Sequence, residues 1–431
     1  MRQGVKSPVL LLLAGLAWGS PARGQHVQDR GMLMGGGAAE PKAPVETDPW
    51  LPTGAPMAAE IPRPPANPAC SFDGRVCVHP APGVSPAVAR KALAALENAY
   101  RKLVDVLQLP APLTDGGLGG SNALDLYLNA EGSGALRSEH DAPEVTRFDS
   151  ASAFCVLDGP ALLERQATVC VGEAIAWRLD AGTTPAVRRG YAAHLWHIVG
   201  SPTALDDEEL DDAQLHPELG LLRGALLFDL LDERRGQGHL AALGTALLGA
   251  AASKTAPNAW QWDNEPDVFD VLRHTLGDTP RKMAEVMGDL AVTRAFMDSR
   301  VRFDWSLPLS SLPRRVASQR AIYPTGSMYV WLGLDQPMQG ETLAFQAEWE
   351  APVTFYWTLV VVDAAGNELR RIAAPFKERA THVEQQLVNL EGAVGVIVVG
   401  MNLGGVDLAH PFDPDVTPAE PHECTVYLTK L

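Results

Sequence analysis

The sequence lacks an apolar run that is long enough to cross a lipid bilayer. The run from Pro8 to Trp18 has about 11 residues, and the stretch from Leu240 to Ala252 is short and contains two glycines, whereas a membrane-spanning helix needs about 20 residues. Positive charge is also scarce, since 35 Lys and Arg stand against 52 Asp and Glu and give a net charge of −17. We therefore expect no membrane span, and this charge disfavours binding to nucleic acid or anionic membranes.

Familiar catalytic patterns are missing as well. No Gly-x-Ser-x-Gly turn for a nucleophilic serine occurs, and no His-Glu-x-x-His segment, which places two zinc ligands on one face of a helix, is present. The glycine-rich segment Gly116 to Gly120 precedes an expected strand instead of following one, which disfavours a phosphate-binding loop. We expect no cofactor.

The first residues have the features of a secretory signal peptide. Arg2 and Lys6 give a basic start, the run Pro8 to Trp18 is rich in leucine, and Ser20-Pro21-Ala22 supplies small residues for cleavage. We expect residues 1–24 to be removed and the protein to be exported to the periplasm, the cell surface or the medium. Residues 25–68 are rich in Gly, Ala and Pro without hydrophobic periodicity, which predicts a disordered linker.

With 46% hydrophobic residues in 431, the rest of the chain can form more than one folded domain. Apolar spacing predicts helices within residues 69–303 and two strands, Ala123 to Leu128 and Ala153 to Leu157. The expected helices are Ala89 to Leu107, Ala161 to Leu179, Pro185 to Val199, Pro217 to Glu233, Leu240 to Ala252, Asp267 to Leu276 and Arg281 to Met297. The period changes to short strands within residues 304–431, which predicts a β-sandwich. The expected strands there are Ser327 to Leu332, Thr342 to Trp349, Val353 to Val362, His382 to Val388, Val394 to Val399 and Thr425 to Leu428.

Export makes the five cysteines candidates for disulfides, because the compartment beyond the inner membrane permits them. Cys70 and Cys77 bracket an Asp-Gly turn, so we expect them to pair. Cys155 and Cys170 are the expected second pair, and Cys424 is left free and buried, although four cysteines allow three pairings. No cysteine precedes Cys70, which excludes a lipid-anchored cysteine at the mature start.

Several segments resemble a family of secreted bacterial proteins assigned as zinc metalloproteases. The matching segments are Cys77-Val78-His79, the helix Ala89 to Leu107, Pro112 to Gly117 and Leu124 to Leu128. The resemblance extends over roughly residues 70 to 430. It implies an α+β fold, with a mostly helical zincin-like domain over residues 69–303 and an all-β sandwich domain over residues 304–431.

In that family, a helix with His-Glu-x-x-His is followed by a helix that begins Glu-Gly-x-Ala and supplies the third ligand. Aligned on this pattern, Thr168 to Ile175 is the first helix and Gly190 to Trp196 belongs to the second. Cys170 and Ala174 then stand at the histidine positions, Val171 at the general base and Arg189 at the third ligand. The resemblance therefore implies a degenerate site that has lost its zinc ligands and its base.

We therefore expect an exported, non-catalytic metalloprotease-like protein, a pseudoenzyme that acts as a binding or structural module on an unknown extracellular or periplasmic protein or glycan. One alternative is a zinc-dependent peptidase with a rearranged site made from His194, His197 and Glu173, since residues three apart share a helical face. Another is a carbohydrate- or protein-binding function in the sandwich, where an exposed aromatic row could stack on sugar. Its six candidate aromatics are Tyr329, Trp331, Trp349, Phe355, Tyr356 and Trp357.

Two acidic segments allow calcium sites, although solvated loops explain both. They are Asp206 to Asp212 and Phe412 to Glu420.

Overall fold

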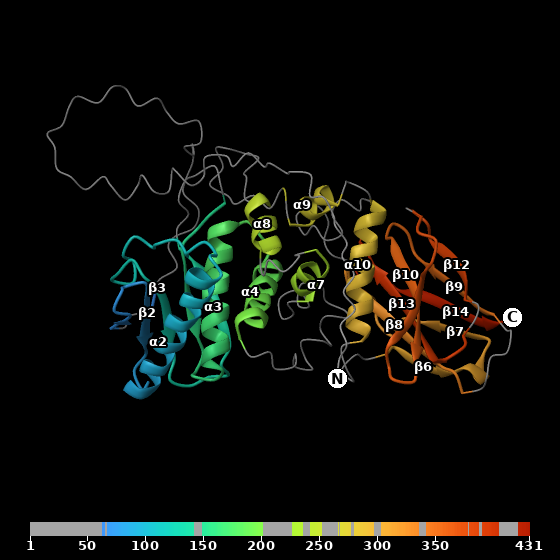
Figure 1. Cartoon of the computed structure of the whole chain (residues 1–431), viewed down its shortest axis with the longest axis horizontal. Helices are drawn as coiled ribbons and strands as arrows, with labels where there is room; N and C mark the ends of the chain where they lie inside the picture. Colours follow the sequence, from blue (N-terminus) through green and yellow to red (C-terminus); the bar gives the residue numbers. More distant parts are fainter. Residues whose placement is uncertain are drawn as a thin grey trace, which may run out of the picture. The chain divides into compact units, whose positions relative to one another are not determined.

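The computed structural model describes residues 63–64, 67–141, 149–200, 226–235, 242–251, 266, 268–276, 280–296, 303–335, 342–377, 379–387, 390–404 and 421–431. Over these residues the chain is an α+β protein (Figure 1). No helix in the described part of the chain is both long and apolar enough to span a membrane. Residues 1–62, with the expected signal peptide and most of the expected linker, lie outside the described residues, as do both acidic segments.

The first half contains a five-stranded sheet in the order β1-β2-β3-β5-β4. Its strands are β1 (Ala69–Cys70), β2 (Val76–Pro80), β3 (Leu124–Leu128), β4 (Leu136–His140) and β5 (Ala153–Leu157). The three central strands are parallel and the two edge strands antiparallel. β3 and β5 are buried at every position, as expected for central strands with both faces covered.

Two of the helices cover one face of this sheet. The described helices are α2 (Pro86–Tyr100), α3 (Leu163–Leu179), α4 (Pro185–Val199), α7 (Leu226–Arg235), α8 (Ala242–Ala251), α9 (Val268–Thr275) and α10 (Pro280–Ala295). α2 and α3 pack on β2, β3 and β5 (Figure 1). α2 begins as the sequence predicts, because Ser85 accepts a hydrogen bond from the Val88 amide and Pro86 follows it.

The predicted helices and strands occur close to their expected bounds where the structure describes them, with two differences within residues 69–303. The first part of the helix expected from Pro217 to Glu233 lies outside the described residues. The helix expected to Leu107 changes at Arg101 into a π-helix, η2 (Arg101–Val106). Strands β1, β2 and β4 were not predicted. Because of these strands, the sheet is a substantial part of residues 69–303, and a mostly helical domain is not shown.

Residues 305–430 form two further sheets, in the orders β11-β10-β13-β8-β6 and β12-β9-β14-β7. Their elements are β6 (Trp305–Pro308), the 3-10 turn η4 (Leu309–Ser311), β7 (Arg314–Ala317), β8 (Ser327–Gly333), β9 (Leu343–Trp349), β10 (Phe355–Asp363), β11 (Glu368–Ala373), β12 (His382–Leu387), β13 (Ala393–Asn402) and β14 (Cys424–Lys430). One apolar cluster contains buried side chains from both sheets. β6, β7 and β11 were not predicted.

Helix α10 packs on β10 and β13. Tyr329 donates a hydrogen bond to the carbonyl of Ala291 at 2.8 Å, and Arg294 donates one to the carbonyl of Thr325 at 2.8 Å. One core cluster therefore contains side chains from the helices and from this sheet.

Candidate functional site

Helices α3 and α4, which carry every position that the family resemblance assigns to the metal site, pack closely against each other. Thr184 accepts a hydrogen bond from the Val187 amide and Pro185 begins α4, so the sequence itself fixes this helix start. The two helices approach at Gly172, where an added Cβ would lie 3.0 Å from both Cα and Cβ of Ala192. The small residues bring the two backbones together.

Three of the positions assigned to the degenerate site serve packing. Cys170 forms a disulfide with Cys155, which joins α3 to β5. Val171 and Ala174 are buried in the core. None of these three side chains has a ligand atom available for a metal ion.

Glu173 is held by partners of its own. It is buried, accepts a short hydrogen bond from Ser138 of β4, and lies 3.4 Å from Nε of Arg189. Burial raises the pKa of Glu173, although the bond from Ser138 and the charges of Arg189 and Arg188 oppose that shift. Arg188 lies 3.7 Å above the ring of Trp177, and burial lowers its pKa to about 10.

The two histidines of α4 meet two aspartates of α7. Nδ1 of His194 lies 2.7 Å from Asp229, and its Nε2 lies 2.9 Å from Asp232. Nδ1 of His197 lies 2.7 Å from the other oxygen of Asp229. The structure thus brings His194 and His197 together, but joins them to Asp229 and Asp232 and not to Glu173. We call these four residues the His–Asp cluster.

The bonding in the His–Asp cluster sets the protonation of His194. An ionised carboxylate only accepts hydrogen bonds, so both ring nitrogens of His194 must carry a proton for both bonds to form. A protonated imidazole cannot ligate a metal, because metal binding requires a free nitrogen lone pair. Within the described residues, no three His, Cys, Asp or Glu side chains are arranged to hold a metal ion.

The hydrogen bonds of the cluster shift the pKa values of His194 and Asp229. Desolvation lowers the pKa of His194, but the hydrogen bonds and charges of Asp229 and Asp232 outweigh it and raise the pKa overall. Desolvation raises the pKa of Asp229, but its bonds to His194 and His197 lower the pKa overall. The cluster is therefore an ion-paired clamp between α4 and α7.

We predict that this clamp weakens as the pH rises. A raised folded-state pKa means that the stabilising contribution of His194 is fully present below its unfolded pKa of about 6.5 and is lost as the pH passes through the folded pKa above that value. Urea unfolding between pH 5.5 and 8.5 should show this loss in the wild type and less of it in His194→Asn. The matched control is His382→Asn, since His382 is exposed on β12. Equal pH slopes in the wild type and His194→Asn would contradict the prediction.

Sequence reasoning missed Asp229 and Asp232. The available signal was their spacing. Asp229 and Asp232 are three residues apart on one expected helix, just as His194 and His197 are on another. Which helix faces which depends on the tertiary fold.

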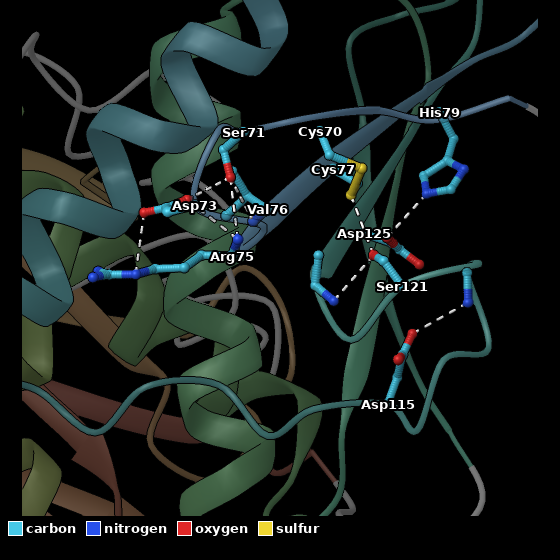
Figure 2. The surroundings of a disulfide bond; sticks show 12 residues. Cys70, Ser71, Asp73, Arg75, Val76, Cys77, His79, Asp115, Ser121 and Asp125 are labelled. Carbon is cyan, nitrogen blue, oxygen red and sulfur yellow. Dashed lines mark hydrogen bonds and ion pairs between the residues drawn. A yellow bond between two sulfur atoms is a disulfide. The ribbon is translucent and has the colours of Figure 1, made fainter.

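Both expected disulfides are present. Cys70 pairs with Cys77 across β1 and β2 (Figure 2), Cys155 pairs with Cys170, and Cys424 is free and buried. Burial raises the pKa of the Cys424 thiol, so this cysteine has the character of an apolar core residue and not of a nucleophile.

The six aromatic side chains considered for sugar stacking do not form an exposed row. All except Trp331 are buried, and Trp331 is partly buried against Phe303 and Gly395. They belong to the interior of the β-rich part. Any glycan-binding surface of the described strands would have to use other residues.

No family model and no curated protein matches the chain. A solved structure of the pre-peptidase C-terminal domain of a collagenase from Bacillus anthracis matches with 7% identity and a TM-score of 0.19, over 30% of this chain and 98% of that one. The enzymatically active domain of tailspike protein 4 from bacteriophage CBA120 matches with 10% identity and a TM-score of 0.16, over 24% of this chain and 13% of that one. Both TM-scores are too low to carry an argument.

Proposed function

We propose that this protein is an exported, non-catalytic protein of metalloprotease-like architecture that acts as a binding module outside the cytoplasm. The observation that carries the proposal is the Cys155–Cys170 disulfide. In the resemblance to secreted metalloproteases, Cys170 stands where the first zinc-binding histidine belongs. A side chain that is covalently joined to a neighbouring strand cannot leave its position to bind an ion.

The surroundings of Cys170 support the same proposal. Val171, at the position of the general base, cannot accept a proton. Arg189, at the position of the third ligand, carries a permanent positive charge and pairs with Glu173. Each position assigned to the former site has taken a role in packing or in ion pairing, so we propose that this fold has kept its helices for stability and lost the hydrolytic reaction.

The rearranged metal site is the rival that one observation favours. His194, His197, Asp229 and Asp232 converge from two helices, and their atoms are of the types that bind zinc. Zinc would have to displace the protons that the present hydrogen bonds require. The proposal of a non-catalytic protein therefore predicts that zinc does not compete with these bonds at neutral pH.

Two measurements on exported protein test the proposal. We expect mass spectrometry to find the mature chain beginning near residue 25, because the apolar run and the small residues after it form a cleavable signal. We expect zinc-supplemented protein to hydrolyse no member of a mixed peptide library above the level of the His194→Ala/His197→Ala variant, which serves as the matched control. An intact Met1 on exported protein would contradict export, and zinc-dependent cleavage absent from the variant would contradict the non-catalytic role.

A further inference from the structure

The sheet β1-β2-β3-β5-β4 has an apolar face that α2 and α3 cover, and an opposite face that carries polar side chains. Alternate residues of β2 and β3 point to opposite faces, so Val78 and Leu126 belong to the helix-side core while His79 and Asp125 share the other face. Figure 2 shows the ring of His79 turned toward Asp125. Tyr127 lies beside them, stacked on His79 with ring centroids 4.4 Å apart.

Three buried carboxylates on this side surround one guanidinium. Arg63 donates from Nη1 to Asp115 at 2.6 Å and, through a short bond, to Asp125. Its Nη2 lies 2.7 Å from each oxygen of Asp141. The Arg63 side chain is 9% exposed, and those of Asp115, Asp125 and Asp141 are 2%, 0% and 5% exposed. We call the three aspartates the Asp pocket.

The shape of the Asp pocket fits a planar guanidinium. Two of its carboxylates contact one terminal nitrogen of Arg63 and the third contacts the other, and the ring of Phe154 lies 4.8 Å from the central carbon of the guanidinium. Arginine combines a flat, weakly hydrated charge with a fixed fork of donors, so it can satisfy several carboxylates while stacking on an aromatic ring. A compact ammonium ion or a spherical metal ion has no flat face to place on Phe154.

The carboxylates of the pocket are held in place by bonds that do not involve Arg63. Asp115 accepts hydrogen bonds from the amides of Gly117 at 2.8 Å and Gly119 at 3.3 Å, and Asp141 accepts one from Ser152 at 2.9 Å. Gly119 has no side chain for a steric reason, since a Cβ there would overlap the Asp125 carboxylate. The pocket is therefore formed by the loop and strands themselves.

The charges in the pocket are not balanced by Arg63 alone. Three carboxylates face one guanidinium, and the neighbouring side chain is His79, whose Nε2 lies 2.9 Å from Asp125. Nδ1 of His79 is buried without a hydrogen-bond partner among the described residues. Removing a cation from such a buried carboxylate group is strongly unfavourable, so an emptied pocket would attract another cation.

The contacts that the structure describes for Arg63 are made by its side chain. No backbone hydrogen bond of Arg63 or Pro64 to another described residue is present, and the following Pro64 and Pro65 have no N–H to donate. The guanidinium can therefore leave without disrupting a strand pairing. Its tether keeps it at a high effective concentration, which a competing arginine from another chain must overcome.

We propose that the Asp pocket is a binding site for an arginine side chain, and that the protein's own Arg63 occupies it in this structure. The site names a chemical class of ligand for the proposed binding role, namely an arginine of a partner protein. The existence of the pocket does not depend on that role, but the partner does. Arg63 then acts as an intramolecular competitor that limits access to the pocket.

Chemical rescue tests the pocket. Arg63→Ala should lower the melting temperature by roughly 6–20 °C, because the pocket loses its cation. Millimolar ethylguanidinium should restore much of that loss saturably, whereas ethylammonium and calcium should not. Arg63→Gln, which keeps part of the side chain, serves as the second variant if Arg63→Ala does not fold. The wild type should show no saturable stabilisation, because its pocket is filled.

A second arm tests the partner. A short arginine-containing peptide should bind Arg63→Ala at least about tenfold more tightly than it binds the wild type, and an added Asp141→Asn substitution should abolish that gain. An unchanged melting temperature in Arg63→Ala, or rescue that ethylammonium or calcium matches, would overturn the pocket. Rescue by ethylguanidinium without any peptide binding would support the pocket as a guanidinium site and contradict the claim that a partner protein supplies the arginine. Neither arm involves zinc or peptidase activity, so the two proposals fail separately.

Discussion

Replacing both Cys155 and Cys170 by alanine should lower the free energy of unfolding by about 3 kcal/mol. The two cysteines are 15 residues apart in sequence, and a cross-link over a loop of that length restricts the unfolded chain by about this amount. Both side chains are fully buried, so the substitution also removes packed atoms between β5 and α3. Urea unfolding of the mature protein measures the difference.

The Cys70–Cys77 disulfide supplies the matched control. It spans only 7 residues, and Cys70 is exposed on the edge strand β1, so the corresponding double alanine variant should lose less stability. A chain that loses equal stability from either double substitution, or none from Cys155→Ala/Cys170→Ala, would contradict the account. The role of Cys170 as a cross-link, in place of a ligand, would then have no energetic support.

Gly172→Leu should destabilise the protein by roughly 3 kcal/mol. A Cβ at this position already lies 3.0 Å from the Cα of Ala192 and 3.3 Å from Cδ1 of Leu195. A leucine must therefore push α4 away from α3, and overpacking a dense core costs about 1–3 kcal/mol or more. The displacement should also lengthen the bonds of His194 and His197 to α7, so the pH dependence described above should weaken in the same variant.

Gly249→Ala is the control for this substitution, since both glycines lie in helices. Among the described residues, an added Cβ at Gly249 meets only Leu179, at 3.8 Å, so alanine fits there and gains about 0.5–1 kcal/mol from its helix preference. Alanine at Gly172 has the same preference but meets the backbone of α4. Stabilisation by both Gly172→Ala and Gly249→Ala would show that the α3–α4 contact is looser than the structure indicates.

The sequence predicted best the elements that carry clear local signals. Strand β5 and helix α4 match their expected bounds because an apolar strand and a capped helix are both defined locally. The missed strands β4 and β11 are rich in charged residues, so no apolar alternation marks them. They pair at sheet edges, where one side of a strand faces solvent and polar side chains are tolerated.

The site could be predicted only in part. The disulfides followed from local spacing and compartment, and the pairing of His194 with His197 followed from helix geometry. The aspartates that bind these histidines come from α7, and Arg63 reaches its pocket from a segment whose composition predicted only a linker. Such partners depend on contacts between distant parts of the chain, 32 residues apart for His197 and Asp229 and 78 for Arg63 and Asp141, and no periodicity encodes them.

Zinc content of the mature protein is the most direct test of the non-catalytic role. Purified protein would be equilibrated with excess zinc at neutral pH, passed through gel filtration and analysed by elemental mass spectrometry beside His194→Ala and His197→Ala. We predict far less than one zinc per chain in all three proteins, because both ring nitrogens of His194 are engaged by Asp229 and Asp232 and the remaining family positions hold no ligand. About one zinc per chain in the wild type, lost in either variant, would contradict the account and identify the His–Asp cluster as a metal site.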